Sequence, residues 1–254
     1  MNDVTRHPLL VLALSFIVLW ASAWIGALYN RWRRGPIEEL REDFGVILTA
    51  TLTLLALIIG FSFSMAIARY DQRKNLEEEE ANAIGTEYVR ADLLSAADAA
   101  KVRSLLGTYL DQRILFYTTR DEGELQQISA RTAQLQTELW SMVRAPTAAQ
   151  PPPIVVLAVS GMNDVLNAQG YTQAAWWNRI PFAAWVLMTA IAICGNLLIG
   201  YGWRSTKSGP LLLPVLPLVV SIALMLIADI DSPRYGFIQV TPQNLISLSE
   251  SLRR

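Results

Sequence analysis

Residues 44–68 read FGVILTATLTLLALIIGFSFSMAIA, a run that contains no charged side chain. At a rise of 1.5 Å per residue, about 20 apolar residues in a helix cross the roughly 30 Å hydrocarbon core of a bilayer. Because lipid offers no hydrogen-bond partner to backbone groups, such a run must satisfy those groups internally, as a helix. The stretch therefore predicts a transmembrane helix.

Three further charge-free runs have the same character, and they are residues 8–29, 180–203 and 210–228. Over the whole chain 52% of the residues are hydrophobic and only 17% are charged, which is too apolar for an ordinary soluble domain. Aromatic residues stand at the ends of the runs, as in a bilayer interface. They are Trp32, Trp176, Trp177, Tyr201 and Trp203. The sequence thus predicts an all-α integral membrane protein with four transmembrane helices.

The long polar region between the second and third runs is also predicted to be helical. The charged sequence RYDQRKNLEEEE (69–80) follows the second run with no Gly or Pro to end a helix, so one helix should continue towards residue 94. Ser95 and Asp98 resemble a capping box, which marks a new helix start. Further helices are expected at 95–118, 122–144, 154–168 and 242–252, with a proline-rich linker at 145–153.

These elements predict four parts of the chain. They are a first transmembrane hairpin (1–68), a helical cytosolic domain (69–178), a second transmembrane hairpin (179–228) and a cytosolic C-terminal tail (229–254). Four crossings place both termini and the 69–178 region on one side of the membrane. Lys and Arg flank the runs in equal number on the two sides, so the positive-inside rule does not choose between orientations. We expect cytoplasmic termini, because the 69–178 region then needs no translocation.

Composition and motifs argue against several classes of protein. The net charge is −1, so the chain does not have the excess of basic residues that is typical of nucleic-acid-binding proteins. A single cysteine, Cys194, and a single histidine, His7, leave no set of ligands for a zinc site, so we expect no metal and no cofactor. Phosphate-binding, dinucleotide and hydrolase motifs are missing, which argues against an enzyme. The membrane runs also lack the carboxylates on which proton-coupled transporters rely.

Small and hydroxyl side chains share one face of the second run, at spacings of three and four residues. This pore-lining candidate face consists of Thr49, Thr53, Ala56, Gly60 and Ser64. Hydroxyls and bare backbone tolerate water and ions, so the face can line a pore. The commoner alternative in membranes is close packing against another helix through small residues.

A bulky stripe of Leu57, Phe61 and Met65 lies beside that face, at spacings of four residues. In a ring of identical subunits these side chains would form a hydrophobic neck that gates by dewetting. In a monomer they would only contribute to packing.

Charged residues after the second run are candidates for a pore mouth, and they are Arg69, Asp71, Arg73, Glu80 and Glu87. A ring of such charges would concentrate ions of one sign. The acidic residues favour cations and the arginines favour anions, so both selectivities stay open. Two alternatives exist: a solvated helix end beside lipid headgroups, and an internal ladder of ion pairs, because Glu80 and Glu87 stand at heptad spacing.

Several motifs resemble one known family. They are GFSFSMA (60–66), RYDQR (69–73), EANAIGTEYVRADLL (80–94) and DIDSPRYG (229–236). With these motifs the chain resembles the bacterial bestrophin-like family, and the resemblance extends over nearly its whole length.

The resemblance implies a multi-pass protein of the bacterial plasma (inner) membrane. Bestrophins proper are pentameric anion or cation channels with four membrane helices per subunit, cytosolic termini and a hydrophobic neck on the second helix. By position, Leu57, Phe61 and Met65 would be the neck. Only Asp229 and Asp231 match the acidic calcium clasp of animal bestrophins, and the rest of a calcium loop is missing, so a structural role is expected for them.

The leading hypothesis is therefore a homo-oligomeric, pentameric ion channel that conducts ions passively along its second transmembrane helix. Its expected partners are the lipid bilayer, further copies of itself and inorganic ions, with no nucleic acid. The alternative is a membrane-anchored helical interaction or signalling protein without transport activity, which would dock a partner on residues 69–179. Oligomeric state separates the two, because only a closed ring turns the stripes on one helix into a pore.

Overall fold

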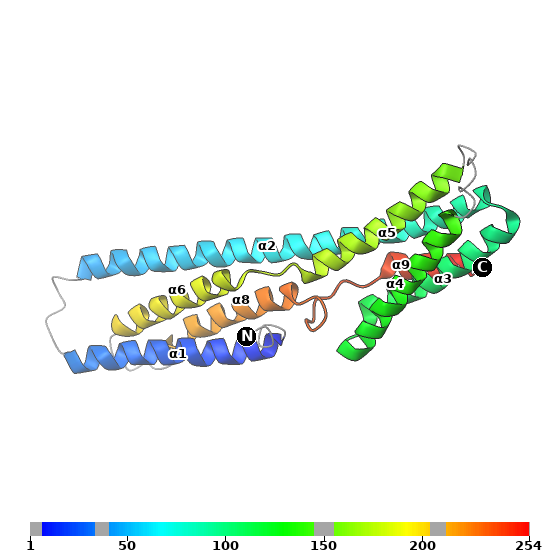
Figure 1. Cartoon of the computed structure of the whole chain (residues 1–254). Coiled ribbons are helices and arrows are strands. Elements are labelled where there is room, and N and C mark those ends of the chain that lie inside the picture. The colour runs from blue at the N-terminus through cyan, green and yellow to red at the C-terminus, as the bar shows by residue number, and fades with distance from the viewer. Residues whose placement is uncertain (1–6, 34–40, 145–154, 204–211, 254) are drawn as a thin grey trace. The chain divides into compact units, whose positions relative to one another are not determined.

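A computed structural model describes residues 7–33, 41–144, 155–203 and 212–253, and in these ranges the fold is all-α (Figure 1). The helices are α1 (Pro8–Arg33), α2 (Arg41–Arg90), the 3-10 turn η2 (Ala91–Leu93), α3 (Ala96–Thr118), α4 (Glu122–Arg144), α5 (Val155–Trp177), α6 (Phe182–Tyr201), α8 (Val215–Asp231) and α9 (Gln243–Leu252). The predicted all-α class is confirmed. The expected linker at 145–153 lies outside the described residues.

The chain divides into two compact units. The first unit, called the apolar unit below, comprises Met1–Ala68 and Arg179–Ile238. The second, called the helical unit, comprises Arg69–Asn178 and Gln239–Arg254. The helix α2 is unbroken from Arg41 to Arg90 and so contributes residues to both units.

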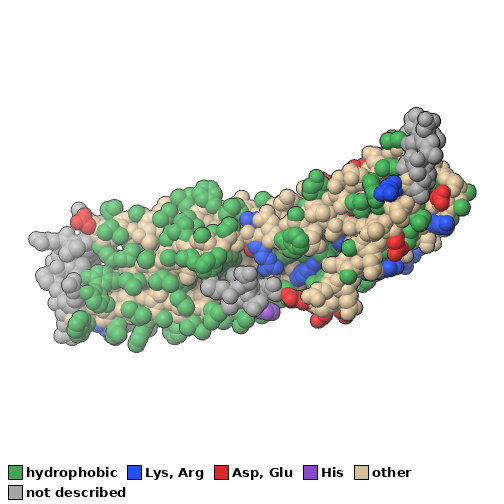
Figure 2. Space-filling view, in the orientation of Figure 1, with side chains coloured by type: hydrophobic (Ala, Val, Ile, Leu, Met, Phe, Trp, Pro, Cys, Tyr) green, Lys and Arg blue, Asp and Glu red, His purple; other side chains and the backbone are tan. Residues whose placement is uncertain are grey.

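Long apolar helices make up the apolar unit. Three segments are long and apolar enough to cross a membrane, namely Pro8–Trp32, Asp43–Leu93 and Val155–Tyr201, the last of which contains α6. The fourth predicted crossing is α8, whose 17 residues span about 25 Å, at the lower end of what a bilayer requires. Figure 2 shows hydrophobic side chains spread over the surface of this unit.

The helices α1 and α6 touch through their backbones. A Cβ atom added to Gly26 would overlap the carbonyl oxygen of Leu197, and one added to Gly200 would overlap the carbonyl oxygen of Ala23. Glycine at both positions lets the two helices approach more closely than larger side chains would permit, as is common between membrane helices. Figure 1 shows α1 beside α6 and α8, which it contacts along its length.

Buried carboxylates organise the turn at the end of α8. Asp231 accepts hydrogen bonds from the backbone N–H of Ile180 at 3.1 and 3.2 Å, and Asp229 accepts one from Phe237 N–H at 2.6 Å. A side chain at Gly236 would overlap the carbonyl oxygen of Asp229, so the turn accommodates only glycine there. Both aspartates are nearly fully buried, and their bonds to backbone amides give them the structural role that the sequence suggested.

The helical unit follows the predicted boundaries in part. Ser95 caps α3 by accepting from Asp98 N–H at 3.3 Å and donating to its carboxylate at 2.7 Å, so the predicted capping box is confirmed. The helix α5 is longer than predicted and continues to Trp177. Trp176, expected in a bilayer interface, packs instead against Phe116 and Tyr117, with ring centroids 5.0 and 5.3 Å away. The Trp176 ring thus belongs to the buried core of the helical unit.

The close contact of α1 and α6 makes a testable prediction. Replacing Gly200→Ala should lower the stability of the detergent-solubilised protein by about 1–3 kcal/mol, because the new methyl group forces the helices apart. The matched control is Gly45→Ala on α2, where an added Cβ would meet no atom within 4 Å. Thermal unfolding measures both, and equal melting temperatures for the two variants would contradict the predicted contact.

Candidate functional site

Within the apolar unit, α2 has one face that packs and one that does not. The packed face carries Leu55, Ser62 and Ala66, which are 3%, 3% and 0% exposed and stand at spacings of seven and four residues. On the same side of α2, the ring centroid of Phe44 lies 5.7 Å from the ring centroid of Tyr201 on α6. This face attaches α2 to the rest of the unit.

The pore-lining candidate face lies on the opposite side of α2. At about 100° per residue, Thr53, Gly60 and Ser64 lie opposite the packed face, whereas Thr49 and Ala56 lie to one side of it. Its members, Thr49, Thr53, Ala56, Gly60 and Ser64, are all exposed in the single chain. A Cβ atom added to Gly60 would meet nothing within 4 Å. The small side chains of this face therefore do not serve packing within the chain.

The candidate neck is exposed as well. Leu57, Phe61 and Met65 are 51%, 66% and 43% exposed, and they lie beside the small-residue face. Large apolar side chains on the surface of a membrane helix contact either lipid or another subunit. The chain thus presents a bulky stripe and a small, partly polar stripe next to each other, and both are exposed among the described residues of the unit.

Beyond residue 69, α2 reverses this pattern and buries charges. Besides Ala81, the buried positions are Arg73, Glu77, Glu80, Ile84 and Glu87 of α2 and Ala91, the first residue of η2, and these six follow one another at alternating spacings of four and three residues. This is the heptad spacing of a helix that packs along one seam. We call these six residues the α2 seam, and four of them carry a charge.

Burial of the α2 seam changes the interpretation of the pore-mouth candidates. Arg73, Glu80 and Glu87 are at most 1% exposed, because the helices of the same unit cover them. This differs from the expectation that they face a pore mouth, and it corresponds to the alternative of internal charge interactions. Asp71 is exposed and Arg69 is half-buried, so these two remain closer to the expected placement.

Arg73 binds the C-terminal end of α5. Its guanidinium donates to the carbonyl oxygens of Ala175 at 3.2 Å and Asn178 at 3.1 Å. The last carbonyls of a helix have no partner within the helix, and they carry its partial negative charge. Arg73 therefore satisfies the end of α5 with a side chain from α2.

Glu77 binds the opposite kind of helix end. Its carboxylate accepts from the backbone N–H of Leu245 at 2.9 Å and from the side-chain amide of Asn244 at 2.6 Å. Both residues lie in the first turn of α9, where free N–H groups favour an anion. The carboxylate thus fixes the C-terminal helix to α2.

Glu80 is the centre of a buried polar cluster. It forms an ion pair with Arg113 of α3 and accepts hydrogen bonds from Thr172 of α5 at 3.2 Å and Tyr117 at 3.4 Å. Burial by itself lowers the pKa of Arg113, but the neighbouring Glu80 carboxylate raises it above its ordinary value. Burial raises the pKa of the Tyr117 phenol, and Glu80 adds to that effect. The cluster joins α2, α3 and α5.

Sequence reasoning did not identify the partners of these charges. The heptad spacing of Glu80 and Glu87 left an internal ladder of ion pairs open as an alternative, but Arg113 and Thr172 lie in other helices and carry no local signal. Glu77 was treated as part of a solvated acidic run, and only its place on the seam distinguishes it from Glu78 and Glu79, which are exposed.

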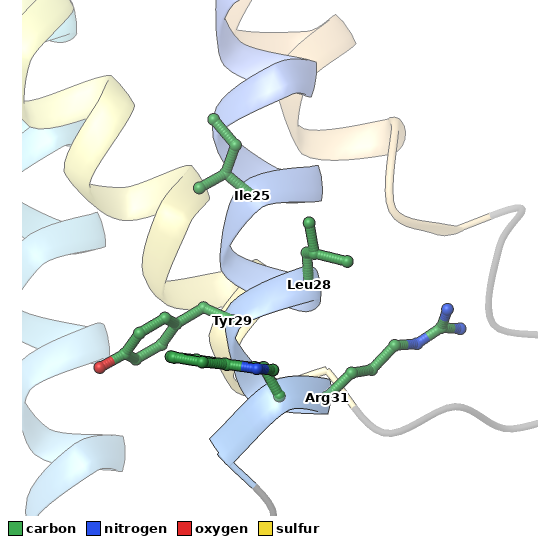
Figure 3. A pocket seen from close by; sticks show the side chains of 5 residues that line it. Ile25, Leu28, Tyr29 and Arg31 are labelled. Carbon is green, nitrogen blue, oxygen red and sulfur yellow. The ribbon is translucent and has the colours of Figure 1, made fainter.

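A cavity of about 540 Å³ lies at the C-terminal end of α1, lined by Ile25, Leu28, Tyr29, Arg31 and Trp32. Figure 3 shows Tyr29 and Arg31 pointing to opposite sides of the helix. Aromatic rings next to a cation on an apolar helix are typical of the bilayer interface. We therefore interpret this cavity as a hollow in the lipid-facing surface, not as a catalytic site.

The buried Glu80–Arg113 pair makes the second prediction. Arg113→Met should lower the free energy of unfolding by about 3–5 kcal/mol, because it leaves a buried carboxylate without its counter-charge. Adding Glu80→Leu to this variant should restore part of the loss, since an apolar pair no longer buries an unpaired charge. Denaturation of the full-length protein in detergent measures both.

The matched control for this prediction is Arg131→Met. Nη1 of Arg131 lies 3.9 Å from Oε1 of Glu138, and both side chains are about half exposed. Exposed pairs of this kind contribute little to stability, so this variant should unfold like the wild type. If Arg113→Met and Arg131→Met had the same effect, the central role of the buried cluster would be refuted.

Comparison with known proteins places the chain in a family. A bacterial Bestrophin homologue from Klebsiella pneumoniae, solved with a leucine-to-threonine substitution, aligns over 95% of this chain and 97% of its own, with 14% identity and a TM-score of 0.64. A second structure of it, with an isoleucine-to-threonine substitution, aligns over 96% and 99%, with 13% identity and a TM-score of 0.66.

A structure described as a membrane protein aligns similarly, over 95% of this chain and 97% of its own, with 14% identity and a TM-score of 0.62. These three alignments show a shared fold. None of the curated proteins matches the sequence. Residues 15–245 match the Bestrophin-like domain, which is most of the chain. The protein therefore belongs to the Bestrophin-like family.

Proposed function

We propose that this protein is a subunit of a homo-oligomeric ion channel in which α2 lines the pore. The observation that carries the proposal is the exposed side of α2 in the apolar unit. There, Thr53, Gly60 and Ser64 stand beside Phe61 and other bulky side chains, and all of these are exposed among the described residues of the unit. A ring of subunits would turn the first stripe into a polar pore wall and the second into a constriction.

Family membership supports this proposal, because bestrophins proper are pentameric channels with a hydrophobic neck on the second membrane helix. The solved relatives share the fold over nearly the whole chain. In the proposed pore, Thr49, Thr53, Ala56, Gly60 and Ser64 form the wall. Leu57, Phe61 and Met65 form the neck. Passive conduction needs no cofactor, and the partners are lipid, inorganic ions and further copies of the chain.

The proposed topology follows from the same assembly. Residues 69–178 and the tail 229–254 lie in the cytoplasm of a bacterium, and residues 1–68 and 179–228 form two hairpins in the plasma membrane. Arg69 and Asp71 then stand where α2 leaves the bilayer. Because Arg73, Glu80 and Glu87 are buried, we assign the charges at the pore mouth to Arg69 and Asp71 alone.

Thiol accessibility tests which side of α2 faces water. In a Cys194→Ser background, Thr53→Cys and Ser64→Cys should react with a charged thiol reagent, and the reaction should reduce the current in a planar bilayer. Leu14→Cys on α1 is the matched control, because Leu14 is a half-exposed apolar side chain on another helix of the apolar unit and would face lipid. Reaction at all three positions, or at Leu14→Cys alone, would contradict the proposed pore wall.

The neck is tested by conductance. Phe61→Ala should raise the unitary conductance or the leak at rest, because a smaller side chain widens and wets the constriction. Ile17→Ala on α1, also an exposed apolar side chain, should leave the currents unchanged. Lack of any current over a range of voltages and salts, together with a monomer or dimer by mass in detergent, would favour the alternative of a membrane-anchored interaction protein.

A further inference from the structure

Glu87 differs from the other charged residues of the α2 seam. Its side chain is 0% exposed, and neither carboxylate oxygen has a hydrogen-bond partner in the part of the chain that the structure describes. Arg73, Glu77 and Glu80 each bind a neighbouring helix, as described above. A buried carboxylate without hydrogen bonds is costly in its charged form, so its presence requires an explanation.

The surroundings of Glu87 are built closely around it. Gly161 of α5 lies against its carboxylate, and a Cβ atom added to Gly161 would overlap Oε2 of Glu87 and come within 2.5 Å of Nη1 of Arg90. The absent side chain of Gly161 thus provides the space that Glu87 and Arg90 fill. Any change in the charge or hydration of Glu87 therefore acts directly on the contact of α2 with α5.

Burial favours the neutral form of Glu87, and the neighbouring charges act on it in opposite directions. Arg90 on α2 lies 3.8 Å from the carboxylate of Asp164 on α5, so one guanidinium faces two carboxyl groups. The charges on η2 and α3, Asp92 and Arg103, pair with each other. Burial raises the pKa of Glu87 to about 8, Arg90 opposes this rise, and Asp164 adds to it.

We propose that Glu87 is a proton-binding site that holds α5 against α2. With its proton, the carboxyl group is neutral and fits the buried space beside Gly161. Without the proton, a second negative charge stands next to Asp164 and must gain water or capture Arg90 from that residue. Either response loosens the contact between α2 and α5, so the helical unit responds to a rise in pH.

The sign of the pH dependence follows from linkage. The folded protein keeps the proton up to pH about 8, whereas the unfolded chain releases it near 4.5, the ordinary value for this carboxyl group. Between these values the folded state binds more protons than the unfolded state, so stability falls as the pH rises. The contribution of Glu87 is fully present below pH 4.5 and is lost as the pH passes through about 8.

Infrared spectroscopy of the full-length protein in detergent tests the proton. The wild type should show a buried carboxylic-acid C=O band at pH 6 that disappears with a midpoint near pH 8. Glu87→Gln should lack this band, and Glu79→Gln, which changes an exposed glutamate of the same helix, should retain it. A midpoint in the range of exposed carboxyl groups, or the same band in Glu87→Gln, would overturn the proposal.

A second variant and a second measurement keep the test decisive if Glu87→Gln does not fold. Asp164→Asn should lower the midpoint, because it removes a negative charge and releases Arg90 to Glu87. Amide exchange over residues 155–164, corrected for the intrinsic effect of pH, should rise about tenfold in the wild type per pH unit as the pH approaches the midpoint from below, and it should level off above the midpoint. Exchange that does not rise below the midpoint would refute the loosening of α5.

Discussion

The helical unit depends on the burial of charge along one side of a single helix. The Glu80–Arg113 pair is the centre of this arrangement, since it is buried, hydrogen-bonded further by Thr172 and Tyr117, and shared by three helices. A buried ion pair is costly to form and more costly to break, because removal of one partner leaves the other uncompensated. Such a pair adds less to stability than to specificity: α3 and α5 can dock on α2 only where their polar groups meet Glu80.

The rest of the α2 seam follows the same logic with different chemistry. Arg73 satisfies the carbonyls at the end of α5, and Glu77 satisfies the amides at the start of α9. Each charge therefore meets a helix end of the opposite partial sign. Between Phe44 and Ala68, in the apolar unit, the same helix carries no charged residue. There Leu55, Ser62 and Ala66 are buried, and the small and bulky stripes are exposed.

Local signals in the sequence were sufficient for most helices and insufficient for the site. The capping box at Ser95 located the start of α3, and the charge-free runs located the membrane helices. The end of α5 was missed, because Trp176 resembles an interfacial residue until its contacts with Phe116 and Tyr117 are known. Likewise, the partners of Arg73 and Glu80 could not be predicted, since they lie about 100 and 33 residues away along the chain and leave no trace in the local pattern.

The α2 seam also fixes the register of the chain. Insertion or deletion of one residue between Arg73 and Glu87 would rotate everything beyond it by about 100° and turn the remaining charges away from their partners. Several attachments would fail together, whereas substitution of one charge breaks only one. The spacing of the seam is therefore constrained more strongly than the identity of any single residue on it, and related chains should vary in length outside this segment and not within it.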